Sequence, residues 1–193
     1  MALTTLDPVT ALIVVDLQRG LMGSTFIHPI ADIVTRAQNL IAAFRQQRLP
    51  IALVNVDGTA PGRTERPRRI QKLPDSWTEL LPELGRQADD IVVTKRTWGA
   101  FASTDLESQL KRRGVTQVVI SGVATGTGVE STARQAYEAG FNVTLAIDAM
   151  TDARPGAHDY SIANVFPRLG ETGATQAILD LLERTHTNDR ACK

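Results

Sequence analysis

Three stretches of the chain place polar or glycine residues directly after apolar runs. Asp16 follows LIVV, Lys95 follows IVVT, and the turn GVATGTG (122–128) follows VVIS. Open parallel sheets bind ligands beyond the carboxyl ends of their strands. These residues are therefore candidates for one site in which a carboxyl group, an amine and backbone N–H groups meet.

The glycine-rich turn also carries a helix-start pattern. Thr127 and Glu130 have the spacing of a capping box, which predicts a helix beginning near Gly128. Free N–H groups at that start would favour a negative or developing-negative oxygen. Gly126 and Gly128 would let a ligand approach closely. An alternative stays open, in which the glycines only allow the strand and helix to pack tightly.

The elements that would position these residues alternate along the chain. Continuous apolar runs predict buried strands at 11–17, 51–57, 90–95, 116–122 and 142–148. Helical patterns cover 31–47, 103–114, 127–140 and about 174–185. The segment 58–77, rich in Pro, Gly and Arg, predicts a long irregular loop. This order predicts one α/β domain over residues 1–193, a three-layer α/β/α sandwich with a mostly parallel sheet of about six strands and a flexible tail at 185–193.

Composition restricts the partners. The formal net charge is zero, which gives nucleic-acid binding little electrostatic support. No apolar run approaches membrane-spanning length, and MALTTLDPVT does not read as a signal peptide. The only cysteine, Cys192, predicts no internal disulfide and fits a cytoplasmic protein. Three scattered histidines give no metal-ligand spacing, and the GxGxxG pattern is absent, so we expect neither a metal nor a cofactor.

Three blocks in this order resemble the signature blocks of the isochorismatase-like hydrolases: ALIVVDLQ (11–18), KRTWGAFASTDLESQL (95–110) and SGVATGTGVESTARQAYEAGFNVTLAIDAMTD (121–152). The resemblance extends from about residue 11 to 182. It implies Rossmann-like strand order, a homodimer or homotetramer, and a non-proline cis peptide near Val123–Ala124. It also implies catalytic positions at Asp16, Lys95 and Gly128. Most family members carry a nucleophilic cysteine at the last position; true isochorismatases resemble this chain in lacking it.

The glycine at position 128 decides which chemistry we expect. Amide hydrolysis by the family route needs a thiolate to form an acyl intermediate, which glycine cannot supply. Thr125, Thr127 and Ser131 offer hydroxyls, but the sequence places no histidine beside them, and His28, His158 and His186 are expected to be surface or packing residues. A cysteine-type amidase is therefore not expected.

An enol ether such as isochorismate needs no protein nucleophile. Protonation of its terminal CH2 gives an oxocarbenium ion that water attacks, and this requires only a positioned acid. The resemblance implies that Asp16 is the acid, that Lys95 orients it, and that N–H groups around Thr127 and Gly128 bind water or a carboxylate. The acid must keep its proton at neutral pH, although burial raises an aspartate pKa and a nearby Lys⁺ lowers it.

Substrate-binding candidates surround this centre. Gln18 could fix the carboxylate of Asp16, or it could be a solvated loop residue. Among the arginines Arg63, Arg66, Arg68, Arg69 and Arg96, Arg63 is the first choice for binding a substrate carboxylate. Trp98 and Phe101 could form an apolar wall, or lie in the core. Ala124, Thr125 and Thr127 complete the set; true isochorismatases carry an aromatic residue where Ala124 and Thr125 stand, which indicates a differently shaped small-molecule substrate.

Two other functions remain open at this level. One is a non-catalytic ligand-binding or partner-binding protein on the same fold, which would have no reason to keep Asp16 and Lys95 facing one cleft. The other is an amidase with a displaced nucleophile, which predicts a hydroxyl within hydrogen-bond reach of Lys95 or Asp16.

Overall fold

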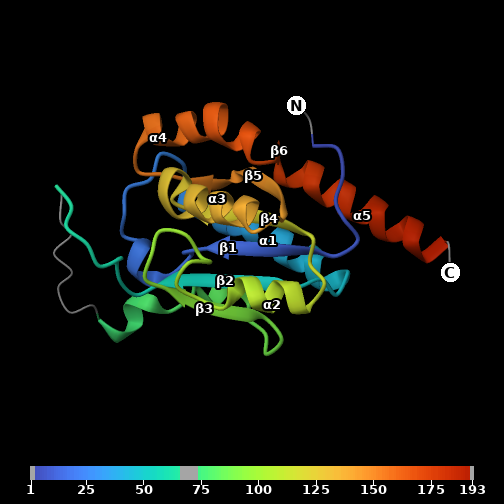
Figure 1. The fold of residues 1–193 in the computed structure, drawn as a ribbon, viewed down its shortest axis with the longest axis horizontal. Coiled ribbons are helices and arrows are strands. Elements are labelled where there is room, and N and C mark those ends of the chain that lie inside the picture. Colours follow the sequence, from blue (N-terminus) through green and yellow to red (C-terminus); the bar gives the residue numbers. More distant parts are fainter. Residues whose placement is uncertain (1–2, 66–73, 192–193) are drawn as a thin grey trace.

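The computed structural model describes residues 3–65 and 74–191, and a six-stranded sheet forms its centre (Figure 1). The strand order is β3-β2-β1-β4-β5-β6, and every neighbouring pair is parallel. This is the doubly wound, Rossmann-like strand order that the family resemblance implied. The strands are β1 Thr10–Val15, β2 Ile51–Val56, β3 Ile91–Lys95, β4 Gln117–Val123, β5 Asn142–Thr151 and β6 Glu171–Gly173.

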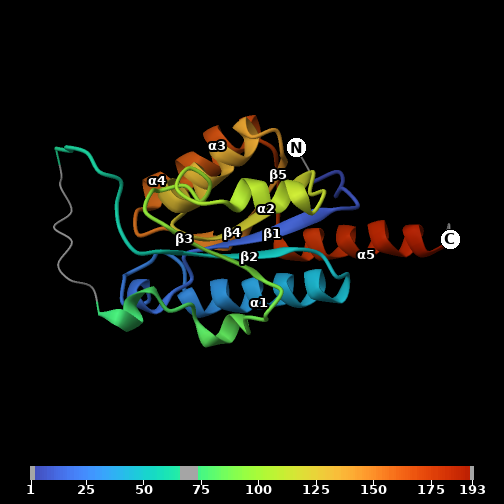
Figure 2. The same cartoon turned by 60° about the horizontal axis from the view of Figure 1, so that its bottom comes forward.

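Helices cover both faces of the sheet (Figure 2). On one face lie α1 (Ile30–Gln46) and α5 (Thr175–Ala191); on the other lie α2 (Leu106–Arg112), α3 (Glu130–Glu138) and α4 (Pro155–Tyr160). Successive side chains of a strand point to opposite faces, so β1 feeds two cores. Ile13 packs in the core that contains α3, and Leu12 packs in the core that contains α1. The predicted three-layer α/β/α fold is confirmed.

Several local expectations differ from the structure. Helix α5 continues into the predicted flexible tail as far as Ala191, since no glycine or proline interrupts residues 175–191 and Thr185 donates a hydrogen bond to Leu6 O (3.5 Å). The flexibility of that tail stays a prediction. The short elements α4 and β6 carried too little periodicity to be predicted. Between β2 and β3 the described residues form only 3₁₀ turns at Asp75–Thr78 and Pro82–Leu84, as expected of an irregular connection. Residues 66–73 of that loop lie outside the described part.

The strand order reverses between β1 and β4, and a doubly wound sheet opens its ligand crevice at such a point. Gly122 allows the two strands to meet closely there. Its φ is +113°, and a Cβ at this position would lie 2.0 Å from Val15 O. A side chain at residue 122 is therefore incompatible with this register.

β5 contains an irregularity opposite the centre of β4. Ile120 pairs with Leu145 but Gly122 pairs with Met150, so residues 146–149 lie opposite Ser121 alone. The extra residues include Asp148, whose carboxylate accepts hydrogen bonds from the backbone N and the hydroxyl of Thr175 at the start of α5 (2.7 and 2.8 Å). Beyond the irregularity β5 continues to Thr151, beside the carboxyl end of β4.

In residues 3–65 and 74–191 we find no helix long and apolar enough to cross a bilayer.

Candidate active site

Asp16 stands where β1 turns away from the sheet. Its backbone N still donates to Val54 O of β2 (2.8 Å), but its φ of +55° is in the left-handed region, which few residues other than glycine adopt. Strained residues of this kind cluster at functional sites. The turn buries the carboxyl group, whose side chain is only 7 % exposed.

Lys95 is the last residue of β3, two strands away from β1. Neighbouring strands lie about 4.8 Å apart, so the lysine side chain must cross the end of β2 to reach Asp16. It does so: Nζ lies 2.8 Å from Asp16 Oδ2 and donates a second hydrogen bond to Thr97 O (3.3 Å). The lysine side chain is 2 % exposed. The two residues therefore form a buried ion pair at the carboxyl edge of the sheet.

The second oxygen of Asp16 differs from the first. Within the described residues Oδ1 is buried and has no hydrogen-bond partner. Burial raises the pKa of the Asp16 carboxyl to about 6, although the charge and hydrogen bond of Lys95 act to lower it. Burial is therefore the larger of the two opposing effects on the pKa of this carboxyl group. Roughly one Asp16 in ten would still hold its proton at pH 7.

The turn after β4 packs directly on this pair. The Val123–Ala124 peptide is cis, as the family resemblance implied. A single π-helical turn over Thr125–Val129 leads into α3. A Cβ on Gly128 would lie 2.9 Å from Val123 O and 3.1 Å from Asp16 Oδ2. The expectation that Gly128 lets a ligand approach closely is therefore not supported directly above its Cα, where Asp16 and the main chain already lie.

The predicted capping box is wrong. Glu130 does not turn back to the helix start, because its carboxylate accepts a hydrogen bond from Ser161 Oγ (2.6 Å) and pairs with Arg134 Nε (3.0 Å). The backbone N of Thr127 donates to Ala124 O (3.1 Å) within the π turn. This N–H group is therefore not free for a substrate oxygen, contrary to the expectation.

Side chains from β5 and α4 hold the turn from the other side. The backbone N of Gly126 donates to Asp152 Oδ2 (2.8 Å), and the Thr125 hydroxyl lies 2.8 Å from His158 Nδ1. The sequence had placed no histidine beside Thr125, because His158 is distant along the chain. Burial is the main cause that lowers the pKa of His158. Thr125 is fully buried, so this pair braces the turn and does not face a substrate.

The remaining candidates lie at different distances from the pair. Gln18 is buried, but it bonds the backbone of Val56 and Trp77 and not the Asp16 carboxylate (2.7 to 3.1 Å). Phe101 belongs to the core beside Phe141, with ring centroids 6.0 Å apart, because the loop after β3 runs down along α3. The apolar wall predicted from it is not formed at this position.

Three of the described candidates are exposed, namely Trp98, Arg63 and Arg96. Trp98 is 64 % exposed in the loop that follows Lys95. Arg63 is exposed in the segment after β2 that extends away from the body of the molecule (Figure 1). Arg96 forms a two-point ion pair with Asp57 at the end of β2 (2.9 and 3.1 Å). The other arginine candidates, Arg66, Arg68 and Arg69, lie outside the described residues.

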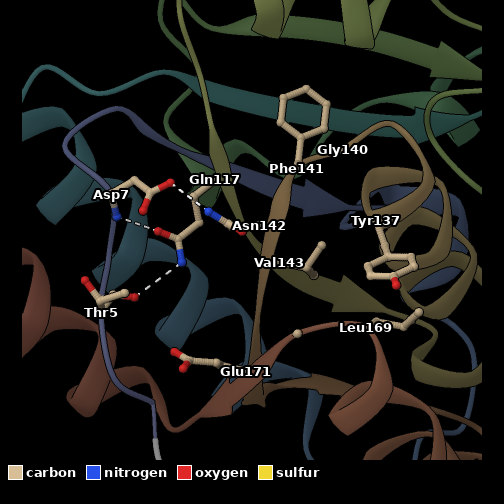
Figure 3. Close-up of a pocket in the computed structure, with 11 residues that line it drawn as sticks. Thr5, Asp7, Gln117, Tyr137, Gly140, Phe141, Asn142, Val143, Leu169 and Glu171 are labelled. Carbon is tan, nitrogen blue, oxygen red and sulfur yellow. Dashed lines mark hydrogen bonds between the residues drawn. The ribbon is translucent and has the colours of Figure 1, made fainter.

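A cavity of about 420 Å³ opens at the opposite, amino-terminal edge of the sheet (Figure 3). Its polar groups largely bond one another: Gln117 Oε1 accepts from Asp7 N (2.5 Å), and Asn142 Nδ2 donates to Asp7 Oδ2 (3.0 Å). Neither Asp16 nor Lys95 lines it. We therefore assign this cavity a structural role in joining the N-terminal segment to the sheet.

No group of three or more His, Cys, Asp or Glu side chains is placed to hold a metal ion, as far as the described ranges extend.

Two residues of α3 that contact the site, Thr132 and Gln135, were not among the predicted site residues. The Thr132 hydroxyl donates to Gly128 O (2.7 Å) and accepts from Ala100 N (3.2 Å). Gln135 Oε1 accepts from Phe101 N (2.9 Å). Their spacing of three residues on a predicted helix was a usable signal, since such residues share a face. Asp152 was also not predicted as a site residue. An acidic residue directly after β5, the strand next to β4, was a usable signal for it.

Known proteins of one family resemble this chain in sequence and in structure. The sequence matches the isochorismatase domain over residues 10–177. It is 39 % identical over 180 residues to the uncharacterized isochorismatase family protein YecD of Escherichia coli O157:H7, covering 90 % of this chain and 96 % of YecD. It is 38 % identical to YwoC of Bacillus subtilis strain 168, an uncharacterized protein of the same family, covering 89 % and 93 %.

A solved structure has the same fold. An isochorismatase family protein from Burkholderia thailandensis is 37 % identical, with a TM-score of 0.89, covering 93 % of this chain and 98 % of that protein. With the buried Asp16–Lys95 pair at the switch point of the sheet, these matches identify the chain as a hydrolase of the isochorismatase family.

Proposed function

We propose that this hydrolase cleaves a small enol ether, or a related activated substrate, by acid-assisted attack of water without a covalent intermediate. One observation carries the proposal: Asp16 is buried and paired through Oδ2, while its Oδ1 has no partner in the described structure. A carboxyl group with a raised pKa and one oxygen that makes no hydrogen bond is suited to deliver a proton.

The proposed reaction balances without a protein nucleophile. Asp16 transfers its proton to the terminal CH2 of the enol ether, and the adjacent carbon becomes an oxocarbenium centre. Water adds to that carbon and returns a proton to the Asp16 carboxylate. The resulting hemiketal loses its hydroxyl proton as its bond to the leaving oxygen breaks, and that oxygen takes up a proton, which releases a ketone and an alcohol. Lys95 holds the carboxylate in place through Oδ2 throughout.

The residue at position 128 argues against the amide route. We place this chain among family members that lack the nucleophilic cysteine, because Gly128 stands at that position and the only cysteine is Cys192. An amidase with a displaced nucleophile would need a hydroxyl beside the pair. In residues 3–65 and 74–191 Lys95 Nζ contacts a carboxylate and a backbone carbonyl, and the nearby Thr125 and Thr132 hydroxyls are engaged elsewhere.

The proposal requires no cofactor, and it takes the partner to be a small molecule. Among the substrate-binding candidates, Trp98 and Ala124 keep their proposed role, as does Arg63, while Gln18 and Phe101 support the site from outside it. Cytoplasmic location and a homodimer or homotetramer stay predictions. Light scattering of the purified protein would measure the oligomeric state.

Turnover of two substrate classes tests the reaction. Purified protein is incubated with isochorismate and, separately, with a panel of small primary amides, and pyruvate and ammonia are followed. We expect pyruvate release that is lost in Asp16→Asn. Asp57→Asn is the matched control, since Asp57 directly follows the neighbouring strand β2 but pairs with the exposed Arg96. Ammonia release, or turnover by Asp16→Asn equal to that of the control, would contradict the proposal.

A further inference from the structure

The loop that follows Lys95, called the Lys95 loop below, and the turn that carries Gly128 are joined through α3. Thr132 is fully buried, and its hydroxyl connects the two: it donates to Gly128 O (2.7 Å) and accepts from Ala100 N (3.2 Å). A single side chain therefore makes one hydrogen bond to each of the segments that meet at the site.

Gln135, one turn further along α3, strengthens the same contact. Its Oε1 accepts from Phe101 N (2.9 Å), and Gly99 packs so closely on it that an added Cβ would lie 2.2 Å from the Gln135 Oε1. Residues three apart on a helix share one face. Thr132 and Gln135 thus form a seat on α3 for residues 99–101.

These contacts form a closed ring that includes the ion pair. Asp16 Oδ2 binds Lys95 Nζ, which also binds Thr97 O in the loop. The loop reaches Thr132 through Ala100, and Thr132 reaches Gly128, whose Cα faces Asp16 Oδ2 again. Release of the ring at one point would let the turn and the loop move apart and open the pair to water.

We propose that Thr132 is a positioning residue: through its two hydrogen bonds it sets the separation of the Gly128 turn from the Lys95 loop and so keeps water away from Asp16. Thr132 touches neither Asp16 nor Lys95 in any contact described above. It acts through the backbone groups of Gly128 and Ala100. The role in turnover rests on the function proposed above, whereas the exclusion of water does not.

Three variants separate this role from ordinary stabilisation. Thr132→Val keeps the shape of the side chain and removes both hydrogen bonds. Thr132→Ser retains the hydroxyl. Thr144→Val is the matched control, because Thr144 is also fully buried and its hydroxyl accepts one hydrogen bond, from Gln117 Nε2 (3.0 Å), at the amino-terminal end of β5.

The readout is the titration of the Asp16 carboxyl carbon by ¹³C NMR, which needs no substrate. We expect the Asp16 pKa in Thr132→Val to fall toward the ordinary aspartate value of about 3.9, because water gains access to the carboxylate. Thr132→Ser and Thr144→Val should titrate as the wild type does. An unchanged pKa in a folded Thr132→Val protein would overturn the proposal.

Activity is a second readout, and a negative result for activity can be told apart from a negative result for the pKa. We expect kcat to fall about tenfold to a hundredfold in Thr132→Val and to recover in Thr132→Ser, as misplacement of a reacting group does in general. If the pKa moves as expected but no variant releases pyruvate, the positioning role stands and the proposed reaction is wrong.

The wild-type protein provides a test if Thr132→Val does not fold. The Ala100 amide proton should exchange slowly with solvent, because it donates to a fully buried hydroxyl. Exchange at the rate of an unfolded chain would show that the contact is not maintained, and the proposal would fail.

Discussion

Lys95 Nζ lies 2.8 Å from Asp16 Oδ2, although the whole of β2 separates the strands that carry them. The contact depends on three features at once: the turn at Asp16, the length of the lysine side chain, and the extension of β3 to Lys95, beyond the level of Val93 at which β1 ends. The pair is also nearly dry, with side-chain exposures of 7 % and 2 %. Its protonation should therefore govern both the activity and the stability of the protein.

The activity should depend on a protonated Asp16. Its pKa is raised to about 6 by burial, so the acid form is abundant below that pH and declines above it. We expect kcat/KM for an enol ether to fall about tenfold per pH unit above about pH 6. Initial rates measured from pH 5 to 9 check this. A profile that rises over this range would indicate that Asp16 acts as a base.

The same pKa predicts how stability varies with pH. An aspartate whose pKa is higher in the folded than in the unfolded protein favours folding when protonated, and this contribution is lost as pH rises from about 4 through about 6. A shift of about two units corresponds to about 3 kcal/mol. We expect Asp16→Asn to lose less stability than the wild type between pH 4 and 7. Urea denaturation at several pH values measures it; parallel curves would contradict the expectation.

Removal of the Lys95 cation should lower the stability of the protein by an amount that depends on pH. Lys95→Met leaves the Asp16 carboxylate buried without its counter-charge, and breaking a buried pair in this way costs about 3–5 kcal/mol. The loss should be largest near pH 8 and smaller near pH 5, where Asp16 can take up a proton.

Lys111→Met is the matched control for that experiment. Lys111 pairs with Glu107 on the exposed side of α2, and such a pair contributes about 0.5 kcal/mol or less. Equal losses for the two variants in thermal or urea denaturation would mean that the Asp16–Lys95 pair is not buried in solution.

Gly128→Ala tests how closely the turn approaches the pair. The added Cβ would lie 2.9 Å from a backbone oxygen and 3.1 Å from Asp16 Oδ2, so the turn must shift. We expect a loss of about 1–3 kcal/mol and reduced turnover. Gly23→Ala serves as the control, because a Cβ there would meet no atom within 4 Å. Equal stability and activity in the two variants would show that the approach at Gly128 is looser than described.

The architecture was open to prediction from sequence because its strands are continuous apolar runs, a pattern typical of a sheet covered on both faces. Asp16 and Lys95 could be selected because the carboxyl ends of such strands meet at one edge. The state of Asp16 could not be predicted, since it depends on how far burial outweighs Lys95. The sequence left Phe101 open between a pocket wall and the core, and the structure places it in the core. Neither of the two roles expected for Gln18 is observed, because its side chain turns to the backbone of Val56 and Trp77.

The contacts around the turn were hidden for another reason. Thr125 and His158 are 33 residues apart, and Gly126 and Asp152 are 26 residues apart. Only the pairing of β4 with β5 and the packing of α4 bring them together. The supposed capping box failed similarly, because Glu130 found a partner in Ser161, which no local pattern could reveal.

The irregular stretch of β5 has a consequence for chain length. Asp148 within it caps α5 on one face, while Asp152 beyond it secures Gly126. Loss of a single residue from 146–149 would reverse the in-and-out order of the side chains that follow, turning Asp152 from its amide. The number of residues in 146–149 therefore sets the direction of Asp152. A protein with a shorter stretch here would need another contact to hold the turn after β4.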